Sequence, residues 1–341
     1  MRPRVDHPER LDAARAGGAP RHGARAVRVG RARTVPGTEE GGPTVIGALI
    51  QGLRPRQWTK NLLLFAGVLF SQQAGHPELL LRAAVGFVAF SLLAGSVYLL
   101  NDLRDIEQDR LHPKKRLRAI ASGRLPVPAA RAATVLLLLT VAALSAWLGP
   151  LFSIVVAAYL VMNFAYSHGL RDQVLVDVFF IALGFVLRAI AGVELLRPLS
   201  PATTLSHWLL VCTFFGALFL ALAKRRRELE NAGEDAGRRR TVLQQYTPAL
   251  LDGLLIVSAA SSIMSYALYT IWPATVAKFN TEALLYTVPF VTYGVFRYLY
   301  LVRASEITED PSQVLLSDRP LTACVALYLV TVVLILYYFR G

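Results

Sequence analysis

Apolar runs of about 20 residues recur along the chain, separated by short polar segments. A helix needs roughly that length to cross a hydrocarbon core of about 30 Å. We therefore expect an all-α, polytopic membrane protein built as a helical bundle. The pattern predicts nine transmembrane helices, at about 58–74, 79–101, 129–148, 151–168, 174–195, 205–223, 249–271, 283–303 and 320–338.

A half-apolar segment, residues 44–57, precedes the first predicted span and ends on Arg54-Pro55-Arg56-Gln57. It suits an interfacial helix that turns at Pro55 into the bundle. Residues 1–43 are rich in Arg, Ala, Gly and Pro and contain no apolar run, so we interpret them as a disordered basic tail. Residues 44–341 would then form one transmembrane domain.

Composition agrees with the membrane interpretation, since 54% of the residues are hydrophobic and only 17% are charged. In a soluble protein a net charge of +13 would suggest nucleic acid as a partner, but cytoplasmic loops of membrane proteins also collect Lys and Arg. The loops after the second and sixth spans hold 14 Lys and Arg residues, whereas those after the first, third, fifth and seventh hold only Arg197 and Lys278. We therefore expect no nucleic-acid partner, a cytoplasmic N-terminus and an external C-terminus.

The polar stretch after the second span reads N-D-x-x-D-x-x-x-D, from Asn101 to Asp109. In a continuing helix Asp102, Asp105 and Asp109 would share one face, with Arg104 and Glu107 pointing away from it. Clustered carboxylates of this kind suit Mg²⁺ that carries a phosphorylated ligand, and the following bases would hold the remaining phosphate charge. Those bases include Lys114, Arg116 and Arg118. The alternative is a solvated helix end with weak Asp–Arg pairs.

A second polar stretch, Tyr166 to Asp172 with Arg171 inside it, follows the fourth span, and Asp177 comes shortly after. Alone it could be a simple polar turn. Paired with the first stretch on the same membrane face, it predicts two carboxylate clusters that hold a Mg²⁺–diphosphate between them.

Three further features leave two interpretations open. Arg54, Gln57, Lys60 and Asn61 enter the first span, and they could anchor it at the interface or turn inward to a ligand. Lys224 and Arg225 leave the sixth span, as a topogenic basic run or as a phosphate clamp. Arg188 would face the bundle interior with a partner, or extend to the far side with Glu194. It lies about 16 Å from Asp177 along a helix, too far to share one phosphate.

With these residues in view, the chain resembles the UbiA superfamily of intramembrane prenyltransferases, whose two aspartate-rich motifs match the stretches at 101–109 and 166–177. Other segments resemble its decaprenyl-phosphate phosphoribosyltransferase branch. They are R-P-R-Q-W-T-K-N at 54–61, H-P-K-K-R-L-R at 112–118, G-F-V-L-R-A-I-A-G at 184–192, A-K-R-R-R-E-L at 223–229 and D-R-P-L at 318–321. The similarity runs from about residue 47 to the C-terminus. One departure is Arg171, where the branch usually has Lys.

The resemblance implies transfer of phosphoribose from 5-phosphoribosyl-1-diphosphate to a polyprenyl phosphate, releasing pyrophosphate, on the way to cell-wall arabinose. Asp102, Asp105 and Asp109 would hold Mg²⁺ on the diphosphate, with Asn101 beside them. Asp177 would complete the opposite wall, and Lys114, Arg116, Lys224 and Arg225 would neutralise phosphate charge. The branch also suggests a homo-oligomer in the plasma membrane.

Two rival functions remain. A conventional family member would move a prenyl group from prenyl diphosphate to an aromatic acceptor, using the same metal site. A transporter or lipid-binding protein would not need the aspartates for turnover. The D-G-x-x-A-R signature of CDP-alcohol phosphotransferases is not found in the sequence.

Overall fold

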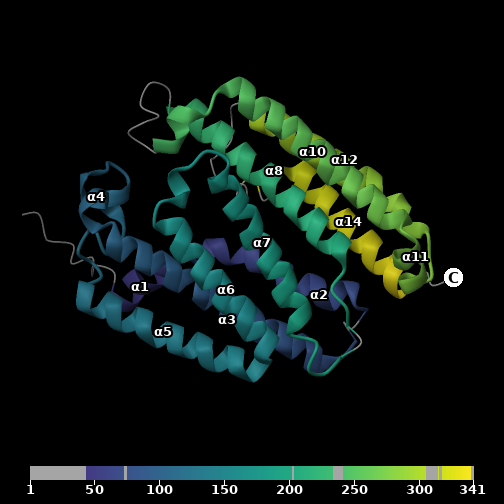
Figure 1. Cartoon of the computed structure of the whole chain (residues 1–341), viewed down its shortest axis with the longest axis horizontal. Coiled ribbons are helices and arrows are strands. Elements are labelled where there is room, and N and C mark those ends of the chain that lie inside the picture. The colour runs from purple at the N-terminus through teal and green to yellow at the C-terminus, as the bar shows by residue number, and fades with distance from the viewer. Residues whose placement is uncertain are drawn as a thin grey trace, which may run out of the picture. The chain divides into compact units, whose positions relative to one another are not determined.

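The computed structural model describes residues 44–72, 75–201, 203–232, 241–304, 314 and 317–338. Every regular element in these residues is a helix (Figure 1). The predicted all-α class is therefore confirmed. The expected tail, residues 1–43, lies outside the described residues.

The chain enters the bundle through a broken helix. Helix α1 (Val45–Leu53) ends at Arg54, which adopts a left-handed backbone conformation with φ 52° and ψ 62°. Pro55 then opens the 3₁₀ helix η1 (Pro55–Leu64), which continues into α2 (Phe65–Phe70). The predicted turn at Pro55 is thus present, because proline suits the first helical turn and cannot continue the preceding helix.

Seven helices of the described chain are long and apolar enough to cross a membrane. They are α3 (Pro77–Arg104), α5 (Val127–Leu148), α6 (Pro150–Ser167), α7 (Val176–Glu194), α8 (His207–Ala232), α10 (Pro248–Ile271) and α14 (Arg319–Tyr337). Six of them match predicted spans within three residues at each end. The tight turn predicted between α5 and α6 is Gly149, whose φ of 122° favours glycine.

The other two predicted spans are composite segments. Residues 58–74 correspond to η1 with α2, and residues 283–303 to η6 (Ala283–Thr287) with α12 (Val288–Arg303). A 3₁₀ helix rises about 2.0 Å per residue, against about 1.5 Å in an α-helix. By these rises η1 and α2 together extend about 29 Å, close to the thickness of a hydrocarbon core. The described chain contains seven uninterrupted helices that could cross a membrane, and the expected total of nine crossings stays a prediction.

Helix α8 differs most from expectation, since it continues to Ala232 rather than ending near residue 223. Arg225 and Arg227 pair with Glu228 and Glu230, each three residues further along the helix. Such pairs stabilise a helix, so the basic run extends α8 instead of forming a loop.

Helix α7 lies at the centre of the fold (Figure 1), in contact with η1, α2, α3 and α6 and also with α8. One core cluster packs α3, α5 and α6 around Phe90 and Phe152, and a second packs α8 and α10 with the start of α7. The approach of α2 to α7 depends on Gly67 and Gly192. A Cβ atom on Gly67 would lie 1.9 Å from the carbonyl oxygen of Gly192.

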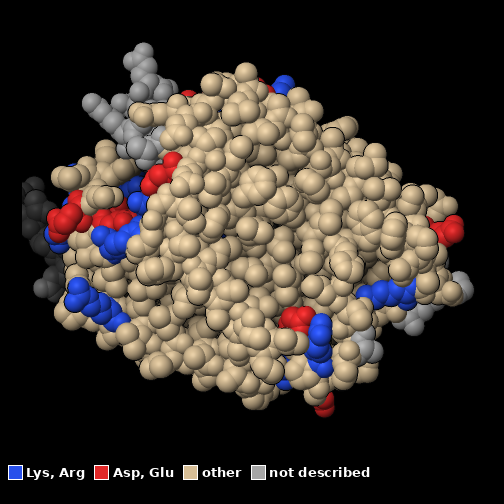
Figure 2. Space-filling model, in the orientation of Figure 1, with Lys and Arg blue, Asp and Glu red and all other residues tan. Residues whose placement is uncertain are grey.

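Charged side chains gather at the ends of the helices (Figure 2), around α4 (Ile106–Leu111) and at the opposite end of the bundle. The broad face between them is almost uncharged. Large apolar side chains on α5 and α6 are exposed, among them Leu136, Leu139, Ile154 and Val161. A face of this kind is satisfied by lipid, so the chain is an integral membrane protein.

Candidate active site

The aspartate stretch begins on α3 and continues past its end. Helix α3 stops at Arg104, because Asp105 has φ −93° and ψ 15°, and α4 begins at Ile106. The continuous helix that would stack three carboxylates on one face is therefore interrupted at the middle one. Asp102 lies in the last turn of α3, and Asp109 lies on α4.

Asp102 and Asp109 nevertheless converge on one cation. Arg118 Nη1 donates to Asp102 Oδ1 at 3.0 Å and to Asp109 Oδ2 at 2.7 Å. Arg54 Nη2 donates to the same Asp102 oxygen at 2.7 Å. Both carboxylates are almost fully buried, with 4% and 2% of their surface exposed. Two buried oxygens from separate helices thus share a single positively charged nitrogen.

Asp105 faces a different pair of arginines. Arg104 Nε donates to Asp105 Oδ1 at 3.0 Å, and Arg171 Nη1 donates to Oδ2 at 3.3 Å. The prediction that Arg104 points away from the aspartates is wrong, because the end of α3 at Asp105 lets the two side chains meet. Glu107 does point away, toward Arg110 at the surface. Burial alone would raise the pKa of Asp105, but the hydrogen bond from Arg104 and the charges of both arginines lower it.

The two predicted stretches meet at the ends of α3 and α6. Ser167 Oγ donates to Asn101 Oδ1 at 2.8 Å, and Arg104 Nη1 donates to the Ser167 carbonyl at 2.6 Å. With the Arg171–Asp105 pair, these bonds place the Tyr166–Asp172 stretch directly beside the aspartates. The expected neighbourhood of the two motifs is therefore found in the structure.

Asp177 lies in a separate, closed cluster. Its side chain is fully buried at the start of α7, where Arg225 Nε donates to Oδ2 and Tyr246 Oη donates to Oδ1 at 2.7 Å. Glu228 also pairs with Arg225, and Lys224 Nζ lies 3.8 Å from Glu228. Burial, together with the hydrogen bond to Asp177, raises the pKa of Tyr246. Both oxygens of Asp177 are thus satisfied within the protein.

The remaining predicted site residues differ in how far their side chains are buried in the protein. Asn61 is buried, and its Nδ2 donates to Ser91 Oγ at 3.0 Å while its Oδ1 accepts from Arg188 at 2.7 Å. Lys60 and Gln57 are half-buried. Lys114 and Arg116 are exposed, and within the described chain neither forms an ion pair with a carboxylate.

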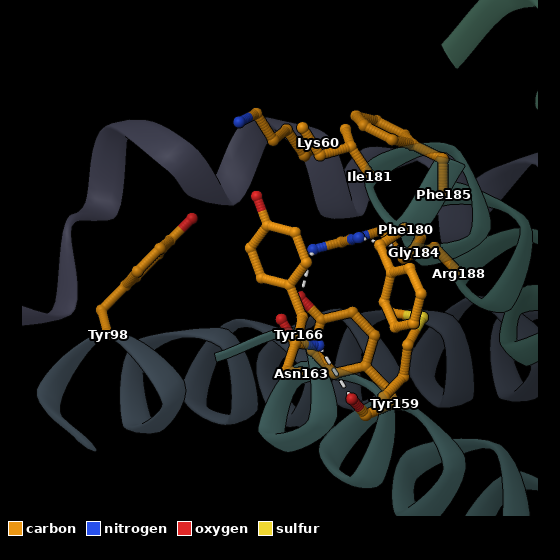
Figure 3. Close-up of a pocket in the computed structure, with 11 residues that line it drawn as sticks. Lys60, Tyr98, Tyr159, Asn163, Tyr166, Phe180, Ile181, Gly184, Phe185 and Arg188 are labelled. Carbon is orange, nitrogen blue, oxygen red and sulfur yellow. Dashed lines mark hydrogen bonds between the residues drawn. The ribbon is translucent and has the colours of Figure 1, made fainter. Parts of the chain in front are cut away.

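A pocket lies between η1, α3, α6 and α7 (Figure 3). Tyr98 stands one helical turn before Asp102, and the guanidinium of Arg54 lies 4.5 Å from the centre of its ring. Polar side chains and apolar ones share the lining. The full set is Lys60, Tyr98, Tyr159, Met162, Asn163, Tyr166, Phe180, Ile181, Gly184, Phe185 and Arg188.

Sequence reasoning missed several of these groups. Ser167 lies inside the Tyr166–Asp172 stretch, and Arg104 lies inside the aspartate motif. The polar composition of both stretches is therefore a signal by which these two residues could be predicted. Lys115 is half-buried beside Arg118, Asp109 and Asp105, and its pKa is lowered chiefly by burial. Because Lys114 and Lys115 are neighbours in the sequence, the sequence does not indicate which of the two lysines lies at the aspartates. Tyr246 had no signal, because it reaches Asp177 from 69 residues away.

The cluster is suited to an anionic ligand. Four arginines (54, 104, 118 and 171) contact four aspartates (102, 105, 109 and 172), and Lys115 lies beside Asp105 and Asp109 as a fifth cation. In the part of the chain that the structure describes, no three acidic, His or Cys side chains converge as a complete metal site. A metal here would therefore need ligand oxygens in addition to Asp102 and Asp109.

Comparisons with known proteins fit this geometry. The family model "UbiA prenyltransferase family" matches residues 61–318. A decaprenyl-phosphate phosphoribosyltransferase of Mycolicibacterium smegmatis is 33% identical over 88% of this chain and 98% of its own length. The protein of the same name from Mycobacterium tuberculosis is 34% identical over 84% and 94%.

Solved structures agree on the fold. A UbiA homologue from Archaeoglobus fulgidus, solved with DMAPP and Mg²⁺, superposes with a TM-score of 0.64 over 85% of this chain and 99% of its own. Its sequence identity is 18%, so it shows the shared helical fold and no more.

Proposed function

We propose a specific reaction for this chain, which belongs to the UbiA prenyltransferase family. It transfers 5-phosphoribose from 5-phosphoribosyl-1-diphosphate to a decaprenyl-type polyprenyl phosphate and releases pyrophosphate. The product would supply lipid-linked pentose for cell-wall arabinan, including arabinogalactan. The observation that carries the proposal is the likeness to decaprenyl-phosphate phosphoribosyltransferases along nearly their whole length.

The donor set at the aspartates fits a magnesium ion. Mg²⁺ binds through one or two carboxylates together with phosphate oxygens and retained waters. Asp102 and Asp109 already direct two oxygens at one positively charged atom, Arg118 Nη1, so they would hold the ion, and the role expected of Asp105 stays a prediction. The metal would neutralise negative charge on the leaving diphosphate.

The arginines support the same step. As the bond between ribose C1 and the diphosphate oxygen breaks, an oxygen of the acceptor phosphate forms the new bond to C1, and pyrophosphate leaves. Negative charge grows on the leaving group, and cations fixed beforehand lower the barrier. Arg54, Arg118 and Arg171 are held at the cluster by their aspartate partners. The acceptor phosphate is already an anion near neutral pH, so no strong general base is required.

The distribution of charge supports an orientation. We place the aspartate cluster and the N-terminus on the cytoplasmic side of the plasma membrane, because Lys and Arg concentrate in the segments after the second and sixth predicted spans. The C-terminus would then be external. A water-soluble phosphoribosyl donor would reach the cluster from the cytoplasm, while the lipid acceptor would enter from the bilayer. A homo-oligomer would follow the branch that the sequence resembles.

A direct assay tests the reaction. Purified protein receives radiolabelled phosphoribosyl diphosphate, polyprenyl phosphate and Mg²⁺, and lipid-extractable label is measured. We expect product that disappears with a chelator, and Asp102→Asn should lower turnover on the order of 100-fold. The variant should still unfold cooperatively, with a lower melting temperature because Arg54 and Arg118 lose a buried carboxylate partner.

Glu107→Gln is the matched control, since Glu107 belongs to the same stretch but is exposed, and among the described residues it pairs with Arg110 alone. It should retain wild-type turnover. Formation of a prenylated aromatic from prenyl diphosphate, with no lipid-linked pentose, would instead establish the conventional family reaction. Unchanged activity in the Asp102 variant would favour a transporter or lipid-binding protein.

A further inference from the structure

Arg188 is a buried cation whose partners are all neutral. It lies on α7, and 6% of its surface is exposed. Its Nε donates to Asn61 Oδ1 at 2.7 Å, Nη1 to the Gly184 carbonyl at 2.8 Å and Nη2 to Tyr159 Oη at 2.9 Å. The rings of Tyr159 and Phe185 lie 4.9 Å and 5.4 Å from its guanidinium carbon. These contacts orient the side chain without cancelling its charge.

No carboxylate of the described chain forms an ion pair with Arg188. An arginine within a transmembrane helix is costly unless a counter-charge or a polar cavity compensates it, and such residues mark ligand pathways. The aromatic rings offset only part of that cost. A guanidinium has five N–H groups, of which these bonds use three, so two remain for a ligand.

A second buried arginine shows what a structural role looks like here. Arg82 also lacks a carboxylate partner within the described residues, but it donates to the carbonyls of Leu148 and Leu195. These are the last residue of α5 and the C-cap of α7, where helix dipoles concentrate partial negative charge. Arg188 contacts the middle of α7 and no helix end. Its charge is therefore not compensated in that way.

Arg188 lines the pocket between η1, α3, α6 and α7, and Tyr98 lies across it (Figure 3). Lys60 brings a second cation to the same pocket, and Tyr166 and Asn163 bring polar groups. Apart from the Tyr159 hydroxyl, which already accepts from Arg188, the other side chains of the lining are apolar. They include Met162, Phe180, Ile181 and Phe185. Such a site suits an anionic group attached to an apolar or sugar body.

We infer that Arg188, with Lys60 on the pocket wall, binds a phosphate monoester inside the bundle. The assignment rests on the proposed function, in which both substrates carry such a group: the donor at its 5-position and the lipid acceptor at its head. It is separate from the closed Asp177 cluster, because Arg188 stands about 16 Å beyond Asp177 along α7. The apolar lining favours the head group of the lipid.

Binding measurements on the full-length protein test the inference without requiring turnover. The probes are farnesyl phosphate, which represents the acceptor, and ribose 5-phosphate, which represents the donor. Dissociation constants are measured for the wild type, Arg188→Gln and the matched control Arg82→Gln. We expect Arg188→Gln to weaken one of the two probes at least about tenfold, since charge-assisted hydrogen bonds are lost.

The two arms identify the source of the phosphate. If Arg188→Gln binds farnesyl phosphate more weakly, the site belongs to the acceptor. If it binds ribose 5-phosphate more weakly, the site belongs to the donor. Arg82→Gln should keep both constants while it lowers the melting temperature. If Arg188→Gln unfolds the protein, Arg188→Lys carries the same test, because it keeps the charge but loses the planar fork.

Folded Arg188 variants that bind both probes as the wild type does would overturn the inference. Failure of the proposed function looks different: the wild type itself would then make no lipid-linked pentose. An active wild type with unchanged binding in the Arg188 variants would refute this inference alone.

Discussion

Two buried arginines lie at different positions along α7, and of the two only Arg225 pairs with carboxylates of the described chain. Arg225, 1% exposed, meets the carboxylates of Asp177 and Glu228 at the start of α7. Arg188 meets an amide, a carbonyl and a hydroxyl further along the same helix. The first cluster is complete without a ligand, whereas the second keeps an uncompensated charge beside a pocket. A basic motif in the sequence therefore does not reveal which arginine holds the fold and which meets a ligand.

The largest expected loss of stability comes from Arg225→Gln. Removing one member of a buried ion pair leaves Asp177 charged and unpaired, which costs about 3–5 kcal/mol. Thermal unfolding in detergent should show the loss, and adding Asp177→Asn should recover part of it. A stable Arg225→Gln protein with a raised KM for the phosphoribosyl donor would contradict the comparison and support the phosphate clamp considered for this residue.

Tyr246→Phe sharpens the comparison with a smaller change. It removes a hydrogen bond to a buried carboxylate, worth about 1.5–3 kcal/mol. Because the pKa of Tyr246 is raised in the folded protein, its contribution is complete below the unfolded value of about 10 and is lost as pH rises through the folded value. The gap in melting temperature between wild type and variant should thus narrow above pH about 10. A gap that stays constant there would show that Tyr246 does not protect Asp177.

The smallest effect is expected for Gly184→Ala. A Cβ atom there would lie 3.4 Å from Arg188 Nη1 and 3.5 Å from Met162 Cε, so the pocket narrows slightly. We expect KM for the substrate bound at Arg188 to rise by about fivefold or less, equivalent to about 1 kcal/mol. Gly253→Ala is the control, since a Cβ atom at Gly253 meets nothing within 4 Å. Equal KM values in both variants would place the ligand away from Gly184.

The sequence was sufficient where local signals decide the structure. Long apolar runs predicted the uninterrupted spans, and Pro55 and Gly149 marked their turns. Proximity of the two aspartate-bearing stretches followed from placing both on one membrane face. Pairings across the fold could not be read in the same way, because Asp177 finds Arg225 and Tyr246 only through tertiary packing. The end of α3 at Asp105 likewise depends on local backbone geometry that the spacing of aspartates does not encode.

The position of α7 in the chain has a consequence for biosynthesis. Asn61 and Tyr159, which orient Arg188, are synthesised before it, whereas Arg225 follows Asp177 by 48 residues. Translation delivers the N-terminal partners first. When α7 leaves the ribosome, the groups that receive Arg188 already exist, but Asp177 has no counter-ion until α8 is made. The counter-ion of Asp177 is therefore supplied by the helix that follows α7, and a chain that stops before Arg225 would leave Asp177 without it.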